Sequence, residues 1–201
     1  MARVRPPAIA STAAAVVAAV VAAGTAACGN DTGSPSSGSS PAAATMSAQP
    51  TGSPTATGRL SAQDKKWMTM IHQVNLAEIE VGRLAQRKGT TAQVRSLGRT
   101  FVDDHTMLDR KVVSVSRSLN ITLPSGVMPD QAELARKLAQ MSGRQFNDTF
   151  VSTSITGHQD AIAATKTEIS RGSNPMVISV ARQALPVLQK HLTMSKKAVH
   201  G

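Results

Sequence analysis

The sequence predicts an all-α protein whose folded part is an up-down four-helix bundle. From Arg59 to Gly201, four long segments repeat apolar residues with the 3.6-residue period of a helix. No segment alternates polar and apolar residues for long enough to predict a strand. Only 2% of the 201 residues are aromatic and tyrosine is absent, so alanine, leucine, methionine and valine must fill the core. This composition favours packed helices over a β-sandwich, whose strands are rich in aromatic residues.

The first helix is predicted between Ser61 and Gly89. Ser61 is a suitable N-cap, and Asp64 follows it three residues later, close to a capping-box pattern. Arg87 and Lys88 carry positive charge at the end where the helix dipole is negative. The apolar stripe of this helix consists of Trp67, Met70, Ile71, Val74, Val81 and Leu84.

The second helix is predicted to begin near Thr91. Residues 120–130 contain two prolines and a glycine, and they form a long connection to the second half of the domain. Within this half a short extra helix is predicted at 131–141, with Asp130 as its N-cap, and Ser142 and Gly143 interrupt it.

The third long helix is predicted at 144–171. Asn174 is a suitable cap for the fourth, and Pro175 suits its first position, where a missing N–H costs no hydrogen bond. Pro186 lies inside the fourth helix and is expected to kink it. Short turns join the first helix to the second and the third to the fourth, which favours antiparallel neighbours.

The N-terminal residues 1–27 are interpreted as a signal peptide of the lipoprotein type. Arg3 and Arg5 precede an apolar stretch at 8–23, which is shorter than the roughly 17–25 residues of a membrane span. Small residues at 25–27 then precede Cys28, the only cysteine of the chain, as in a bacterial lipobox with Thr25 at the usual leucine position. A plain secretory signal with an incidental cysteine and an uncleaved anchor helix are the alternatives.

Residues 28–58 are rich in Gly, Ser, Pro, Thr and Ala, and they are expected to form a disordered tether. A lipid on Cys28 would attach the bundle domain, residues 59–201, to the outer face of a bacterial membrane. The localisation expected from the sequence is therefore that of a secreted, membrane-anchored lipoprotein.

Each long helix has one ionisable residue within its apolar stripe. These residues are Glu78, His105, His158 and His191. In an up-down bundle, a rise of 1.5 Å per residue places them about 16–26 Å from the same end, so they could meet in one layer.

Two interpretations of this layer remain open. It could be a hydrogen-bonded cluster that fixes the register of the helices. It could also bind a single transition-metal ion, because histidine nitrogen and carboxylate oxygen suit zinc, copper, iron and manganese. Asp104 and Asp109 flank His105 and could support a ligand from behind, or could simply be solvated.

Four stretches of the chain resemble domain-of-unknown-function (DUF) family 4142, bacterial envelope proteins with a ferritin-like bundle. They are NLAEIEVGRLA, FVDDH, FVSTSITGHQDAI and ALPVLQKHL. The resemblance implies a ferritin-like fold and an envelope location, and the family's recurring acid and histidines fall on Glu78, His105, His158 and His191. Apolar residues stand three positions before each histidine, where a di-iron site would have glutamates, which argues against a di-iron centre.

Composition and motifs exclude several functions. The net charge is +10, but no run of five or more Lys or Arg occurs, and so few aromatic residues argue against a nucleic-acid surface built on base stacking. No nucleophile–base constellation, phosphate loop or nucleotide fingerprint is present. The sequence therefore predicts a non-catalytic envelope lipoprotein that contacts the membrane and envelope proteins. The alternative is a metal-binding protein for buffering or redox chemistry.

Overall fold

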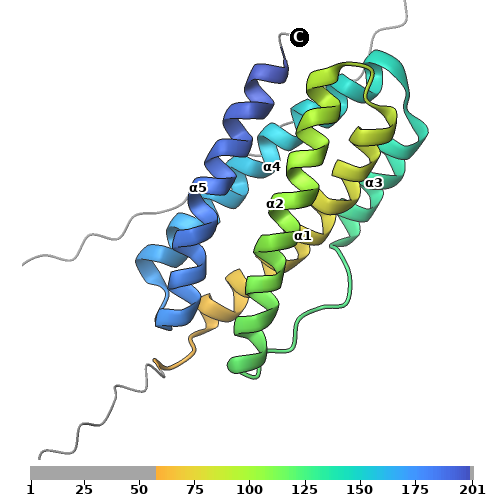
Figure 1. Ribbon diagram of the computed structural model, residues 1–201. Coiled ribbons are helices and arrows are strands. Elements are labelled where there is room, and N and C mark those ends of the chain that lie inside the picture. The colour runs from red at the N-terminus through yellow and green to blue at the C-terminus, as the bar shows by residue number, and fades with distance from the viewer. Residues whose placement is uncertain (1–57, 200–201) are drawn as a thin grey trace, which may run out of the picture. The chain divides into compact units, whose positions relative to one another are not determined.

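The computed structural model describes residues 58–199, and over this range every regular element is a helix (Figure 1). The all-α prediction is therefore confirmed. The predicted signal peptide, Cys28 and nearly all of the predicted tether lie outside the described residues. The helices are α1 (Ala62–Lys88), α2 (Ala92–Ser118), α3 (Pro129–Gln140), α4 (Gly143–Arg171) and α5 (Pro175–Ala198).

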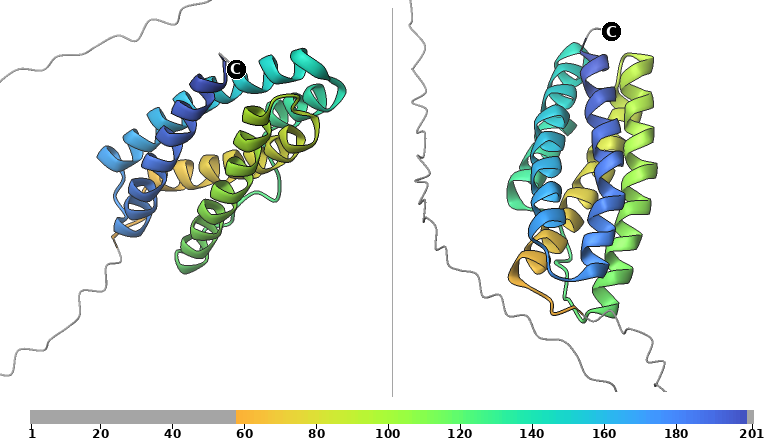
Figure 2. Two further views of the ribbon diagram at one scale, coloured as in Figure 1. Left: turned by 45° about the horizontal axis from the view of Figure 1, so that its top comes forward. Right: turned by 90° about the vertical axis from the view of Figure 1, so that its left-hand side faces the viewer.

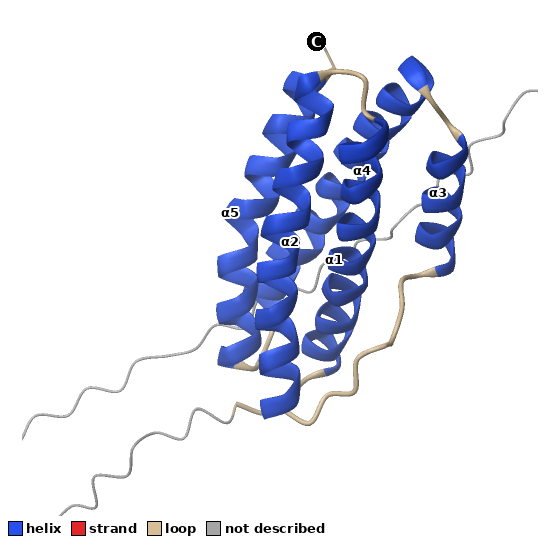
Figure 3. Ribbon diagram, turned by 45° about the vertical axis from the view of Figure 1, so that its right-hand side comes forward, coloured by secondary structure: helices blue, strands red, loops and turns tan. Residues whose placement is uncertain are grey.

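The four long helices pack side by side. Helices that a short turn joins, α1 with α2 and α4 with α5, are neighbours. α1 packs on α2 and α4, while α5 packs on α4 and α2 (Figure 2). The short α3 lies against α1 and α4, and the long α2–α3 connection leads to it (Figure 3). None of the helices within residues 58–199 has the length and hydropathy of a membrane span.

Most helix ends agree with the sequence, and the caps explain why. Ser61 and Thr91 accept hydrogen bonds from backbone N–H groups in the first turns of α1 and α2, as predicted. The prediction for α3 was wrong by two residues at its start: Pro129 takes the first helical position and Met128, not Asp130, is the N-cap. Proline fits that position because its ring already holds the backbone angle φ that a helix requires. α5 runs through Pro186 as one helix.

Two glycines let α1 and α2 approach closely. A Cβ atom at Gly98 would lie 2.6 Å from the carbonyl oxygen of Gly82 and 2.8 Å from the Cβ of Ala85. Neither neighbour is the flexible end of a side chain, so backbone would have to move to admit even a methyl group. This contact therefore brings the backbones of α1 and α2 together at Gly82 and Gly98.

Hydrogen bonds to Asp64 join the start of α1 to the α4–α5 turn. The buried Asp64 carboxylate accepts hydrogen bonds from the N–H and hydroxyl of Ser61, both at 2.6 Å. It also accepts from the backbone N–H groups of Ser173 at 3.0 Å and Asn174 at 3.2 Å. Burial raises the pKa of Asp64, but these four donors outweigh it and lower the pKa to about 2.

Glu168 lies beside this carboxylate and is itself fully buried. Its Oε2 accepts a hydrogen bond from Gln63 at 3.1 Å, while its Oε1 has no partner. Burial, followed by the neighbouring Asp64 carboxyl group, raises the pKa of Glu168 to about 7. Glu168 therefore gains a proton close to neutral pH, while Asp64 stays ionised.

The apolar core consists of two clusters. One contains Trp67, Met68, Ile71, Leu108, Val112, Ala161, Ile162, Val177, Val180, Ala181, Ala184 and Leu188. The other contains Val81, Leu84, Ala85, Val94, Leu97, Phe101, Ala135, Leu138, Phe146, Phe150 and Val151. Along α2, α4 and α5 the three histidines predicted to point inward fall between residues of one cluster and residues of the other. The core is thus two apolar regions separated by a polar layer.

Replacing Gly98 by alanine should destabilise the protein by about 1–3 kcal/mol, the usual cost of forcing extra volume into a packed contact. Urea unfolding followed by circular dichroism measures this change. The control is Gly126→Ala, because nothing lies within 4 Å of a Cβ at Gly126. Equal stabilities for the two variants would contradict the close contact of α1 and α2.

Replacing Glu168 by glutamine should make the protein more stable at pH 8 but change it little at pH 4. The folded-state pKa is raised to about 7 from an ordinary 4.5, so its contribution to stability is complete below pH 4.5 and is lost as the pH rises through 7. A gain of up to about 3 kcal/mol at pH 8 is expected, because the pKa rises from 4.5 to about 7 and each pKa unit is worth about 1.4 kcal/mol. Thermal melts at both pH values test it, and a gain that does not depend on pH would refute the raised pKa of Glu168.

Candidate metal centre

Three histidines from three helices meet in the polar layer. His105 on α2, His158 on α4 and His191 on α5 are 0%, 1% and 0% exposed. The Nε2 of His158 lies 3.2 Å from the Nδ1 of His191, and that same Nδ1 lies 3.3 Å from the Nε2 of His105. One nitrogen of each ring, called here the inner nitrogen, therefore faces a common point, and the group fits within 4.8 Å.

The other nitrogen of each ring, the outer nitrogen, contacts an oxygen. The Nδ1 of His105 lies 2.9 Å from the Oδ1 of Asn75, and the Nδ1 of His158 lies 2.8 Å from the carbonyl oxygen of Ser154. The Nε2 of His191 lies 2.9 Å from the Oδ2 of Asp104. A neutral imidazole has one N–H, and an oxygen acceptor fixes it on the nitrogen that faces it. The three inner nitrogens are left with lone pairs.

Lone pairs that face one another at 3.2–3.3 Å repel unless a cation lies between them. If the Asn75 amide were turned so that its NH2 group faced the Nδ1 of His105, the hydrogen of His105 would lie on Nε2. His105 could then donate to the Nδ1 of His191. His158 and His191 would still face each other without a hydrogen, because a backbone carbonyl and an ionised Asp104 can only accept. Hydrogen bonding between three neutral rings therefore cannot satisfy this cluster.

Burial disfavours the charged form of two of the three rings. Burial, followed by the neighbouring histidines, lowers the pKa of His105 well below its ordinary value of 6.5. Burial also lowers the pKa of His191, to about 4, against the opposing hydrogen bond to Asp104. His105 and His191 are therefore neutral at pH 7.

Phe101 closes one side of the cluster with an apolar ring. Its centroid lies 4.9 Å from that of His158 and 4.8 Å from that of His191. It meets His105 edge-on at 5.9 Å. Aromatic packing of this kind holds the three rings in place and excludes water from that side.

Glu78 lies near the cluster but on its outer side. Its Oε1 is 3.8 Å from the Nδ1 of His158, the outer nitrogen, and the carboxylate does not join the group of three histidines. Its Oε2 is buried without a hydrogen-bond partner. Burial raises the pKa of Glu78 against the opposing effect of His158.

The two aspartates that flank His105 in sequence have different surroundings. Asp104 contacts His191 and also accepts a hydrogen bond from Lys190 at 3.1 Å. Burial raises the pKa of Asp104, but these two partners outweigh it and lower the pKa. Asp109 instead lies 2.7 Å from the Nδ1 of His72, away from the cluster.

His72 on α1 lies outside the cluster, and the helical pattern of the sequence favours a surface position for it, but the structure buries it. It is 7% exposed, and its Nε2 lies 3.1 Å from the carbonyl oxygen of Pro124 in the α2–α3 connection. Its two contacts join α1, α2 and the connection. No pattern in the sequence indicates these contacts, because the connection covers a position that an isolated helix would expose.

Two partners of the cluster escaped the sequence analysis. Asn75 is fully buried on α1, three residues before Glu78 and on the same face, and this spacing could have revealed it. Ser154 contributes its backbone carbonyl four residues before His158. Its side chain carries no signal, because any residue offers the same oxygen.

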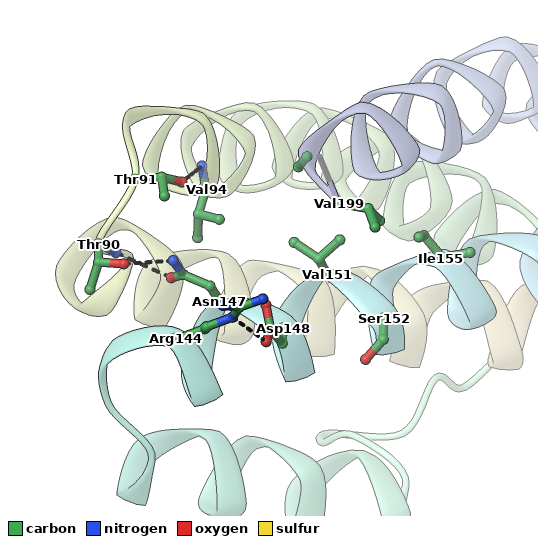
Figure 4. Close-up of a pocket in the computed structure, with 11 residues that line it drawn as sticks. Thr90, Thr91, Val94, Arg144, Asn147, Asp148, Val151, Ser152, Ile155 and Val199 are labelled. Carbon is green, nitrogen blue, oxygen red and sulfur yellow. Dashed lines mark hydrogen bonds and ion pairs between the residues drawn. The ribbon is translucent and has the colours of Figure 1, made fainter. Parts of the chain in front are cut away.

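A hollow beside the α1–α2 turn does not involve the histidines. It measures about 770 Å³ and is lined by Thr90, Thr91, Val94, Arg144, Asn147, Asp148, Val151, Ser152, Ile155, Ala198 and Val199 (Figure 4). Its polar groups bind one another: Asn147 pairs with Thr90, and Arg144 pairs with Asp148. None of its lining residues has a buried polar atom without a partner, and the histidine cluster is the better candidate.

Residues 49–198 match the family described as domain of unknown function (DUF4142). The chain belongs to this family. The match spans the whole folded part of this family member, including all three histidines. No curated protein matches the chain.

Two solved structures share the fold of this DUF4142 chain. A DUF305 fragment from Deinococcus radiodurans is 16% identical with a TM-score of 0.62, and the alignment covers 71% of this chain and 99% of that one. CopM in its Cu(I)-bound form is 15% identical with a TM-score of 0.56, covering 67% and 93%. At such identities the likeness shows the fold alone, a helical bundle.

The metal-free protein should lose stability as the pH falls from 6.5 to about 4. The folded-state pKa of His191 is lowered to about 4, so the unfolded chain binds protons first in this window. The expected loss is up to about 3 kcal/mol from a shift of this size. Urea unfolding in the Glu168→Gln background measures it, since Glu168 titrates in the opposite sense. Adding His191→Gln should flatten the profile, and an unchanged slope would contradict a buried, neutral His191.

Proposed function

We propose that this chain binds one transition-metal ion between His105, His158 and His191, in the core of a ferritin-like four-helix bundle held at a bacterial membrane by a lipid on Cys28. Its role is to hold or buffer the ion. The three rings are 0–1% exposed, which supports holding an ion over catalysis on a substrate.

One observation carries the proposal: three inner nitrogens bear lone pairs and have no hydrogen between them. Two nitrogens bound to one metal at about 2.0–2.1 Å lie about 3.3–3.6 Å apart. The distances of 3.2 and 3.3 Å are close to this spacing before any ion is bound. Each outer N–H meets an oxygen acceptor, the arrangement that orients histidine ligands in metal proteins.

The donor atoms narrow the choice of metal. Imidazole nitrogen suits zinc, copper, iron and nickel, whereas manganese and magnesium prefer oxygen. The cluster among the described residues contains no carboxylate, which also supports a single ion over a carboxylate-bridged pair. Glu78 fits this arrangement as an outer neighbour of His158.

The envelope location rests on the N-terminal sequence. A basic start, an apolar stretch and small residues before the lone Cys28 support lipid attachment, and the tether at 28–58 would separate the bundle from the membrane. Other envelope proteins are the expected partners.

Metal analysis of the full chain tests the proposal. The chain carries Cys28→Ser, which removes the only thiol, and is purified in detergent without a metal-affinity tag. It is offered zinc, copper, iron or manganese, desalted and analysed by mass spectrometry. We expect close to one ion per chain, lost in the His158→Ala, His191→Ala double variant and kept in His72→Gln.

Thermal melts separate metal binding from a purely structural cluster. Metal should raise the Tm of the parent and of His72→Gln, but not that of the double variant. A parent that stays empty with all four metals would overturn the proposal, and the cluster would then be a hydrogen-bonded clamp between helices.

A further inference from the structure

The ligand set brings no charge of its own. All three donors are neutral imidazole nitrogens, and no carboxylate or thiol of the described residues joins them. The site also lies in a dry core, where the solvation cost of an ion is large and rises with the square of its charge. A divalent ion would therefore pay about four times the desolvation cost of a monovalent ion of similar size.

One acid beside the rings is available to balance a single positive charge. Ion pairs of the described residues place Glu78, Asp104 and Lys190 at this layer. Asp104 and Lys190 pair with each other at 3.1 Å, so their charges cancel. Glu78 is left as the one acid without a cationic lysine or arginine partner, 3.8 Å from the outer nitrogen of His158.

The number of donor atoms also favours a monovalent ion. Zinc in structural sites takes four ligands, and in catalytic sites it keeps a water molecule as the fourth. Divalent copper prefers tetragonal coordination. Here there are three nitrogens, Phe101 covers two of the rings at 4.8–4.9 Å, and the rings are 0–1% exposed. Cu(I) has a filled d shell and is satisfied by two or three ligands.

We propose that the three-histidine site selects monovalent copper, Cu(I), over divalent ions, with Glu78 as the counter-charge of the bound ion. This inference rests on the metal binding proposed above and adds the identity and charge of the ion. Selection comes from neutral ligands, low coordination number and a single balancing acid, without any sulfur donor.

Competition titrations test the selectivity on the full chain with Cys28→Ser. Cu(I) is titrated without oxygen against the chromogenic chelator bicinchoninate, and Zn(II) is titrated against a chromogenic zinc chelator. We expect the Kd for Cu(I) to be lower by about 100-fold or more, because the desolvation penalty for the divalent ion is several-fold greater. Equal or tighter binding of Zn(II), lost on His158→Ala, would overturn this inference and leave the proposed function standing. Binding of neither ion would overturn both.

A second comparison tests the counter-charge. Glu78→Gln keeps the shape of the side chain and should weaken Cu(I) binding by about 10-fold, the effect of losing one nearby opposite charge in a buried site. Glu80→Gln is the matched control, because Glu80 is exposed two residues further along α1. Circular dichroism checks that both variants fold. A folded Glu78→Gln variant with unchanged Cu(I) affinity would refute the assigned role of Glu78.

Discussion

The outward hydrogen bonds of three buried histidines determine the chemistry of this protein. Asn75, Ser154 and Asp104 each present an oxygen to one ring, from α1, α4 and α2 respectively. An oxygen acceptor decides which ring nitrogen carries the hydrogen, and so turns a lone pair inward. Without these three contacts the rings could pair with one another as ordinary polar side chains of a helical core. With them, the inner nitrogens of three neutral rings are arranged as the proposed metal site requires.

The packing around this centre explains how the fold tolerates it. Apolar clusters above and below the layer bury most of the hydrophobic surface, while Asp64 and the glycine contact at Gly98 fix the helices at other levels. The polar layer is therefore held by a structure that does not depend on it. Binding of a metal would then add to the stability of a chain that is already folded, in contrast to small domains that fold only with their metal.

Periodicity predicted the four long helices and the meeting of three histidines, because spacing along a helix determines both height and face. It could not predict which nitrogen of each ring points inward, since that depends on side-chain rotation. Glu78 illustrates this limit of the prediction. Its position on α1 is as expected, but its carboxylate lies beside the outer nitrogen of His158. His72 and Asp109 show another, because their burial comes from a connection whose path no pattern in the helices indicates.

The closed surroundings of the histidines also govern how fast an ion could be exchanged. With the rings 0–1% exposed and Phe101 packed against them, a bound ion has no open route to solvent. Its release must wait for a local opening of the helices, and the lifetime of the complex is then set by the frequency of that opening. Transfer of the ion to another protein would accordingly require a partner that loosens the helices. A protein that binds metal in the proposed way would therefore release it slowly, whatever the strength of its metal–nitrogen bonds.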